Sequence, residues 1–328
     1  MNKTATGSTM RGIWLEDRRL QVCDDLDRPE VLQGEALVRV RLAGICQTDL
    51  EMAKGYYPFT GIPGHEFVGE IELAPDQPSR DGERVVGEIN AVCGQCALCL
   101  RGLTHHCLDR TVLGIVGRNG AFAEYLVLPL KNLHRVPDSV SDESAVFTEP
   151  LAAALQILEQ VQVRPSDQIL LIGAGKLGQL IARVLLHAGC SLKVMARHSS
   201  QIDLVAKLGA ELIGEEECPK QQFDIVVEAS GTAQGVSLAR LAVRPAGTII
   251  LKSTYKGEAV LDLASFVVDE IRLVGSRCGP FSPALRLLEK AVIDPTDLIS
   301  EVHQLNDGIQ ALEEASRAGV LKVLLRMQ

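Results

Sequence analysis

Residues 168–178 read Q-I-L-L-I-G-A-G-K-L-G, and this stretch decides the fold of the second half of the chain. Residues 168–172 form an apolar run, as expected for a strand buried on both faces of a sheet. Gly173, Gly175 and Gly178 follow, and a helical pattern runs over residues 177–187. Strand, glycine turn and helix in this order predict the first unit of a dinucleotide-binding domain.

The turn itself supplies the candidate phosphate contacts. The first glycine permits a tight bend, the second lets a pyrophosphate approach the backbone, and the third lets helix and strand pack closely. The helix N-terminus adds N–H groups and a partial positive charge. The predicted cofactor-binding residues here are Gly173, Gly175, Lys176, Leu177 and Gly178. A tight turn without a ligand is the alternative, and the continuing alternation of strands and helices favours binding.

Further strands are expected in the same segment, so that residues 151–275 form one domain. Together with residues 168–172 they number six, as in a doubly wound parallel sheet of the Rossmann type. The expected strands are residues 191–195, 211–213, 223–228, 247–251 and 272–275.

The end of the second of these strands bears on the choice of cofactor. NAD-preferring domains usually place an acidic residue here, which binds the ribose 2′-hydroxyl. This chain has Ala196, followed by Arg197, His198 and Ser199. An arginine attracts a 2′-phosphate, so we expect NADP(H) to be favoured over NAD(H). Arg197 could instead be a solvated surface residue, or stack on adenine without discriminating.

The first segment, residues 1–150, has a different sequence pattern. Many short strands separated by Gly and Pro predict an irregular β-barrel-like domain. Residues 11–26 read as a strand pair, and the first nine or so residues as a disordered leader. The other expected strands are residues 36–43, 66–73, 84–89 and 121–128. Residues 276–328, with helices at 284–291 and 306–318 and a strand at 320–325, are too few for a core of their own, so they should complete this first domain.

Composition excludes several kinds of partner. The chain of 328 residues carries a net charge of −9, which argues against nucleic acid and anionic membrane surfaces. No apolar run is long enough to span a bilayer, and the N-terminus lacks the apolar core of a signal peptide. The simplest location is therefore the cytoplasm, where nine cysteines are better explained by metal binding than by disulfides.

Four of these cysteines lie in a lobe at about residues 90–110, which reads C-G-Q-C-A-L-C-L-R-G-L-T-H-H-C. Cys93, Cys96, Cys99 and Cys107 can close a tetrahedral shell around Zn²⁺ and leave no open position, which is a structural site. A redox dithiol or an iron–sulfur cluster is the alternative, and the tight spacing favours zinc.

A second group of metal-binding residues lies earlier in the chain, in G-I-C-Q-T-D-L (44–50) and G-H-E-F-V-G-E (64–70). Cys46 and His65 are candidate ligands, and Thr48 offers a hydroxyl for proton transfer. Asp49 and Glu66 are carboxylates beside the two ligands. These are the parts of an open, catalytic zinc site, which also needs a third ligand.

The third ligand should come from a distant part of the sequence. Glu149, in F-T-E-P-L-A, lies at the junction of the two segments. It could bind the metal, or it could favour the helix that starts near Leu151 through the helix dipole. Composition alone does not separate these two roles.

The order of these motifs resembles the zinc-dependent medium-chain dehydrogenase/reductase superfamily over residues 11–328. The resemblance is closest to the polyol and threonine dehydrogenases, in which the Glu of E-P-L-A replaces a Cys ligand. It implies a GroES-like catalytic domain, and a catalytic zinc on Cys46, His65 and Glu149, with Glu66 as a direct or water-mediated ligand. It also implies that Thr48 takes the proton of the substrate hydroxyl and that the four lobe cysteines hold structural zinc. Asp49 would contact the zinc ligands without binding the metal itself.

The resemblance implies a hydride transfer between an alcohol or polyol, or its carbonyl, and a nicotinamide cofactor, in a homodimer or homotetramer. One departure concerns the proton's route to solvent, because Glu51 stands where many relatives carry a His. Arg277 lies near where polyol relatives place a substrate-binding Arg, and a structural ion pair is its alternative role. Two rival functions are a zinc-free enone or quinone reductase of the same fold and a non-enzymatic zinc- or nucleotide-binding protein.

Overall fold

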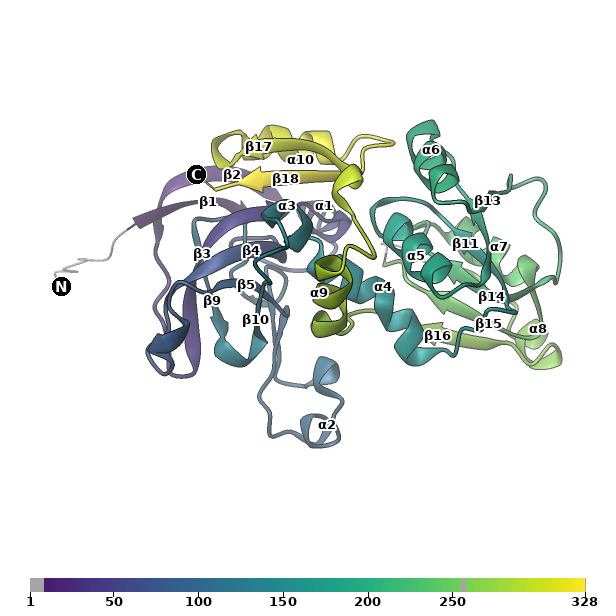
Figure 1. Ribbon diagram of the computed structural model, residues 1–328, viewed down its shortest axis with the longest axis horizontal. Coiled ribbons are helices and arrows are strands. Elements are labelled where there is room, and N and C mark those ends of the chain that lie inside the picture. The colour runs from purple at the N-terminus through teal and green to yellow at the C-terminus, as the bar shows by residue number, and fades with distance from the viewer. Residues whose placement is uncertain (1–8, 255–257, 328) are drawn as a thin grey trace. The chain divides into compact units, whose positions relative to one another are not determined.

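The computed structural model describes residues 9–254 and 258–327, which divide into two compact units (Figure 1). Among the described residues, unit 1 comprises 9–149, 285–316 and 322–327, and unit 2 comprises 150–254, 258–284 and 317–321. Nearly all of the expected leader lies outside the described residues, and the first strand already begins at Thr9. None of the helices within the described ranges is long and apolar enough to cross a membrane.

Unit 1 is built on a sheet of seven strands in the order β10-β5-β4-β3-β18-β17, with β9 also paired to β3. Most of the buried side chains of unit 1 are apolar, and Phe122, Phe147, Ile13 and Leu15 are among the largest that are fully buried. The strands are β3 (Glu35–Gly44), β4 (Glu66–Leu73), β5 (Arg84–Gly87), β9 (Tyr125–Pro129), β10 (Leu133–Arg135), β17 (Ile299–Gln304) and β18 (Lys322–Arg326).

Smaller elements surround this sheet. A hairpin, β1 (Thr9–Glu16) with β2 (Arg19–Asp27), confirms the expected strand pair. A second small sheet contains β6 (Asn90–Ala91), β7 (Thr111–Leu113) and β8 (Gly117–Arg118). The helices of unit 1 are α1 (Gln47–Ala53), α2 (Ala97–Leu100), α3 (Asp142–Ala145), α9 (Phe281–Glu289), most of which lies in this unit, and α10 (Gly308–Ala315).

Two expectations for unit 1 were wrong in detail. The strand expected at residues 121–128 begins only at Tyr125, because Ala121 to Ala123 are buried in an irregular segment that bonds to the loop before β4. β17 was not predicted. Its sequence, I-S-E-V-H-Q, has only two apolar residues, because it is an edge strand whose side chains are mostly exposed.

Unit 2 contains a six-stranded, all-parallel sheet in the order β13-β12-β11-β14-β15-β16, which confirms the doubly wound prediction. The strands are β11 (Gln168–Ile172), β12 (Ser191–Met195), β13 (Glu211–Leu212), β14 (Phe223–Glu228), β15 (Val243–Leu251) and β16 (Arg272–Gly275). β15 begins earlier than the expected Gly247, because a bulge around Pro245 and Ala246 interrupts the apolar pattern.

Helices alternate with most of the strands of unit 2, as Figure 1 shows. α4 (Thr148–Gln160) starts before the expected Leu151, so Glu149 lies inside its first turn. The others are α5 (Lys176–His187), α6 (Ser199–Lys207), α7 (Ala233–Ala242) and α8 (Leu263–Val268). A buried cluster that includes Leu170, Val226 and Ile249 forms the core between the sheet and α7.

Candidate metal centres and nucleotide site

Strand register brings together residues of unit 1 that lie far apart in the sequence. β3 lies between β4 and β18, so Gly44 is paired with Glu66 on one side and with Leu324 on the other. Cys46 is the second residue after β3, and His65 directly precedes β4. The two candidate ligands therefore meet at the same end of the sheet.

Asp49 fixes the geometry of this corner. It is almost completely buried, and it accepts hydrogen bonds from the backbone N–H of Cys46 at 2.8 Å and of Gly64 at 3.2 Å. Its Oδ1 also lies 3.1 Å from His65 Nδ1, although not in hydrogen-bond geometry. With Nδ1 against a carboxylate, Nε2 is the ring nitrogen left for a metal, an arrangement typical of histidine ligands.

Charge around His65 opposes the effect of its burial. Burial would lower the pKa of His65, but the negative charges of Asp49 and Cys46 outweigh it and hold the pKa well above its ordinary value. A cation is therefore favoured at this point of the protein, whether it is a proton or a metal ion.

Cys46, His65 and Glu66 place one ligand atom each within 4.8 Å of one another. His65 and Glu66 are buried, and Cys46 is half-buried. A sulfur, an imidazole nitrogen and a carboxylate oxygen in this arrangement suit Zn²⁺. Thr48 Oγ1 lies 3.8 Å from Cys46 Sγ, so the hydroxyl is beside the group. Glu149 is not part of this group and stays a prediction as the third ligand.

Lys322 is a member of this site that the sequence did not reveal. Its Nζ donates a hydrogen bond to Glu66 Oε2 and lies 5.7 Å from the centre of the Phe147 ring. Burial would lower the pKa of Lys322, but Glu66 and Cys46 raise it above its ordinary value. The available signal was a single lysine in the otherwise apolar run of residues 320–325. Gly44 makes room for the pair, because a Cβ there would lie 2.4 Å from Glu66 Oε2.

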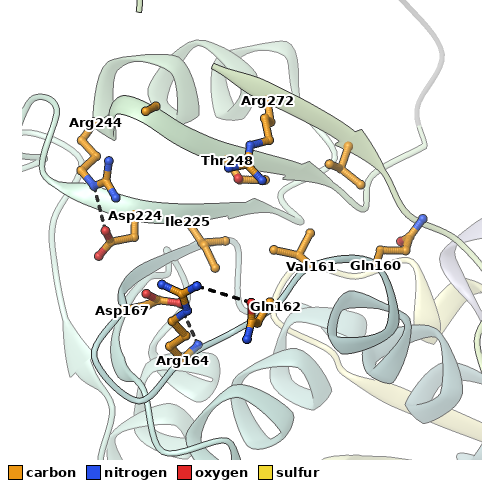
Figure 2. Close-up of a pocket in the computed structure, with 12 residues that line it drawn as sticks. Gln160, Val161, Gln162, Arg164, Asp167, Asp224, Ile225, Arg244, Thr248 and Arg272 are labelled. Atoms are coloured by element: carbon orange, nitrogen blue, oxygen red, sulfur yellow. Dashed lines mark hydrogen bonds and ion pairs between the residues drawn. The ribbon is translucent and has the colours of Figure 1, made fainter. Parts of the chain in front are cut away.

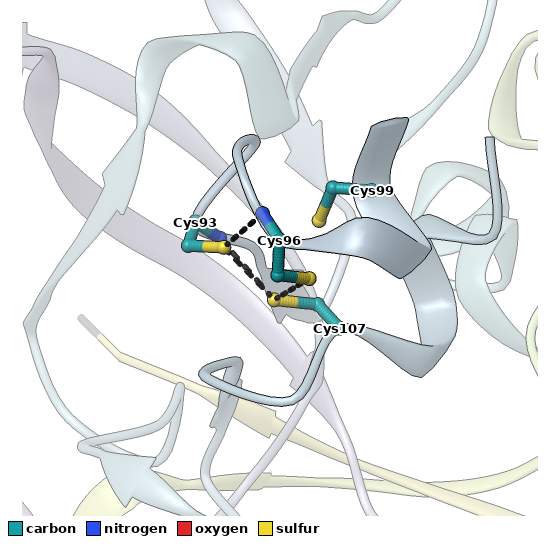
Figure 3. A group of neighbouring side chains, drawn as sticks. All are labelled: Cys93, Cys96, Cys99 and Cys107. Carbon is teal, nitrogen blue, oxygen red and sulfur yellow. Dashed lines mark hydrogen bonds between the residues drawn. The ribbon is translucent and has the colours of Figure 1, made fainter. Parts of the chain in front are cut away.

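The four lobe cysteines also come together (Figure 3). Their sulfurs all lie within 4.8 Å of one another, and Cys107 Sγ is 3.5 Å from Cys93 Sγ and 3.9 Å from Cys96 Sγ. These separations are far beyond a disulfide bond of about 2.05 Å. Backbone N–H groups of Cys99 and Leu108 lower the pKa of Cys96 to about 6, which favours a thiolate there, whereas desolvation raises the pKa of Cys99 to about 12. The donor set fits a closed tetrahedral zinc site.

The glycine turn of unit 2 has the shape expected for a dinucleotide. Gly173 has φ +100°, and a Cβ there would lie 2.7 Å from Ala229 O. A Cβ on Gly178 would lie 2.1 Å from Gly173 O. A Cβ on Gly175 would meet no protein atom within 4 Å, so its side is open toward a ligand. Gly175 also precedes α5, whose N-terminus, with Lys176 and Leu177, can bind phosphate.

A cavity of about 190 Å³ lies beside this turn, between the carboxyl ends of β11, β12 and β14. Arg197 and His198 line it, and Ser199 begins α6 next to them. Glu215, which follows β13, lines it too and was not predicted. Arg197 Nε donates to Glu215 Oε1 at 2.7 Å, although 56% of the arginine side chain is exposed. The two residues meet only in the fold, across 18 positions of sequence.

The two candidate substrate residues lie in different units. Glu51, on α1, accepts hydrogen bonds from Gln47 Nε2 and Lys54 Nζ, both at 3.0 Å. Arg277 is exposed, and its backbone carbonyl accepts a hydrogen bond from Lys252 Nζ at 3.1 Å. These hydrogen bonds lie within the chain, so the roles of Glu51 and Arg277 in substrate binding stay predictions.

A second cavity, of about 270 Å³, lies at the amino ends of the strands in unit 2 (Figure 2). Two of its charged side chains, Arg244 and Asp224, form an ion pair. Arg244 Nε donates to Asp224 Oδ1 at 2.7 Å, and Arg164 Nη2 donates to Gln162 Oε1 at 3.5 Å. None of the predicted site residues lines this cavity, so it is separate from the nucleotide site.

Comparison with known proteins identifies two family models. Residues 32–138 match the alcohol dehydrogenase GroES-like domain, and residues 143–326 match the glucose dehydrogenase C-terminus. Among the curated relatives, D-arabinitol dehydrogenase 1 of Uromyces fabae is 30% identical over 330 residues, which cover 92% of each chain.

Two solved structures with a bound cofactor have the same fold. One is described as a zinc-binding dehydrogenase from Sinorhizobium meliloti 1021 bound to NADP, with 25% identity, a TM-score of 0.89, and coverage of 98% of this chain and 100% of that one. The other is an alcohol dehydrogenase (rspB) from Escherichia coli CFT073 complexed with NADH, with 28% identity, a TM-score of 0.87 and the same coverage. Similarity therefore leaves both cofactors open.

Proposed function

Because the chain belongs to the zinc-containing medium-chain alcohol and polyol dehydrogenase superfamily, we propose that it transfers a hydride between an alcohol or polyol, or its carbonyl, and NADP(H). The observation that carries this proposal is the buried group of Cys46, His65 and Glu66, with the Thr48 hydroxyl beside it. A zinc-free reductase of enones or quinones would not need such a group.

The residues of the site divide the work as follows. Cys46 and His65 would hold zinc. Asp49, whose carboxylate lies against Nδ1 of His65, would keep the imidazole in one orientation. Zinc held there would polarise the substrate hydroxyl and favour its ionisation near neutral pH. Thr48 Oγ1 would accept the proton from that hydroxyl and pass it on toward solvent. Glu51, which lies one helical turn further along α1, is the candidate for the next step of the route.

The nicotinamide cofactor would bind in unit 2. The N-terminus of α5 and the open side of Gly175 would receive its pyrophosphate. When bound, its nicotinamide ring would accept or donate the hydride, and the protein would fix the distance and orientation of the reacting carbon.

We propose Glu149 as the third protein ligand, with Glu66 as a ligand that Lys322 restrains. Zinc or Co²⁺ affinity of Glu149→Ala and Glu66→Ala tests this assignment. We expect Glu149→Ala to weaken metal binding by 10-fold or more. If only Glu66→Ala does so, Glu66 is the third ligand and Glu149 is a residue of the helix terminus.

The proposed preference for NADP(H) rests on Arg197 and on the absence of an acidic residue at Ala196. Arg197→Asp should shift the ratio of catalytic efficiencies toward NAD⁺, because an acid repels a 2′-phosphate and accepts a hydrogen bond from a 2′-hydroxyl. An unchanged ratio would remove the basis for this preference.

We propose that two copies of the chain form a homodimer through β16. This dimer would be either the whole expected assembly or half of a homotetramer. This strand is the last in its sheet, and its Leu273 is exposed. Val260, Leu263, Val267 and Val268, in the segment that precedes β16 in the sequence, are also exposed. Edge strands of this kind pair readily with a second copy about a two-fold axis. Leu273→Lys should convert the dimer to a monomer in sedimentation analysis.

We also propose a cytoplasmic location, because clustered cysteines suited to zinc require a reducing compartment. Fractionation of cells that produce the tagged chain would test it. Recovery in an oxidising compartment would contradict the proposal.

Direct assay tests the reaction. Purified protein should oxidise members of a polyol and alcohol panel with NADP⁺ or NAD⁺, and Cys46→Ser should abolish turnover. The relative named for D-arabinitol makes pentitols the first members to try. Reduction of enones that survives chelation, without any alcohol oxidation, would instead favour the zinc-free reductase.

A further inference from the structure

Three side chains at the edge of the nucleotide cavity form a closed ring of hydrogen bonds, which we call the Arg197 ring. Arg197 donates through Nε to Glu215 Oε1 at 2.7 Å and through Nη2 to Gln234 Oε1 at 3.2 Å. Gln234 Nε2 donates to Glu215 Oε2 at 2.9 Å. Both carboxylate oxygens of Glu215 are therefore used to hold the arginine and its neighbour.

In this arrangement the negative charge of Glu215 offsets the positive charge that Arg197 alone would give the cavity wall. Arg197 and Glu215 both line the cavity, and the negative charge lies within hydrogen-bond distance of the positive one. A dianionic phosphate that approaches Arg197 must either displace Glu215 or lie beside it, and two like charges at that distance repel. A neutral hydroxyl meets no such penalty, since it can donate to a carboxylate.

We propose that Glu215 is a specificity-determining residue, which weakens binding of a 2′-phosphorylated nucleotide and permits binding of one with a free 2′-hydroxyl. It would supply from the loop after β13 the carboxylate that is missing at Ala196, after β12. This inference rests on the proposed function only in that a nicotinamide dinucleotide binds in unit 2. It predicts that the wild-type chain binds both cofactors, and that its preference for NADP(H) is weaker than Arg197 alone would give.

Equilibrium binding of NADH and NADPH to the full-length protein, measured by the fluorescence of the reduced nicotinamide, tests the inference without catalysis. In Glu215→Gln the ratio of Kd for NADPH to Kd for NADH should fall by about 10-fold, because one competing charge is removed and Gln234 can still hold the loop. Glu216→Gln is the matched control. It makes the same change one residue along, at an exposed carboxylate that does not line the cavity.

The outcomes are distinct. A fall of the ratio in Glu215→Gln together with less than a 2-fold change in Glu216→Gln supports the inference. A ratio that stays within 2-fold in Glu215→Gln, or that falls equally in both variants, overturns it, because net charge alone would then account for the effect. Binding of neither nucleotide by any variant overturns the proposed function and the inference together.

Discussion

Lys322 Nζ and Glu66 Oε2 form a hydrogen-bonded ion pair in which both side chains are nearly inaccessible to water, 3% and 1% exposed. The pair joins β18, near the end of the chain, to β4 beside the candidate zinc ligands. Gly44 is the residue between them that leaves room for it. Two charges at this depth are tolerated only because they neutralise each other.

Lys322→Met should therefore be strongly destabilising. In the metal-free protein it leaves the Glu66 carboxylate buried without its partner, which costs about 3–5 kcal/mol. The double variant Lys322→Met/Glu66→Gln should recover most of that loss, because no unpaired charge remains. The urea concentration at which unit 1 unfolds measures both effects. Equal stability of the single and double variants would show that the unpaired Glu66 charge does not cause the loss of stability in Lys322→Met.

Cys99→Ser should remove the structural zinc and leave the catalytic one. Zinc content should fall from about two ions to about one per chain, and the melting temperature should fall because metal binding stabilises the folded lobe. Cys23→Ser, on β2, is the control and should keep both ions. Retention of two zinc ions in Cys99→Ser would contradict a four-cysteine site.

Thr48→Val should slow turnover by about 100-fold, since it removes the hydroxyl proposed to accept the substrate proton but keeps the shape of the side chain. Thr48→Ser should retain most of the activity. Zinc content should be unchanged in both variants, which separates a proton-transfer role from a metal-binding one. Full activity in Thr48→Val would exclude the hydroxyl from the reaction.

Asp224→Asn should lower stability in a pH-dependent way. Burial would raise the pKa of Asp224, but the N–H of Gln168 and the guanidinium of Arg244 outweigh it and lower the pKa below its ordinary value. Its contribution is therefore present above the unfolded pKa, about 3.9, and is lost as the pH falls through the lower folded value. We expect a loss of up to about 1 kcal/mol at pH 7, since water screens the pair.

Urea unfolding of wild type and Asp224→Asn at several pH values checks this prediction. The difference between the two proteins should shrink steadily below about pH 4 and vanish at still lower pH. A difference that stays constant down to the lowest pH would mean that the carboxylate's charge is not the cause.

Much of the fold could be predicted because its signals are local. The strand at residues 168–172 and the glycine turn after it lie in one short segment, and β12, β14 and β16 begin and end where the pattern predicted. Cys46, His65 and the four lobe cysteines are likewise marked by residue type and spacing. All six were predicted as ligands, and the structure gathers them into two groups.

The features that escaped prediction depend on contacts between distant segments. Lys322 and Glu66 are 256 positions apart, and only the placement of β18 beside β3 brings them together. Glu215 reaches Arg197 because β13 pairs with β12. β17 is an edge strand without an apolar pattern, so nothing in its own sequence predicts it.

The most direct test of the account is the zinc content of wild type and His65→Ala, measured alongside polyol oxidation by the same preparations. The account predicts about two zinc ions per chain in wild type, and about one in His65→Ala, with loss of turnover. Wild-type protein that contains only the zinc of the cysteine lobe after purification with excess zinc, and still oxidises alcohols, would contradict it.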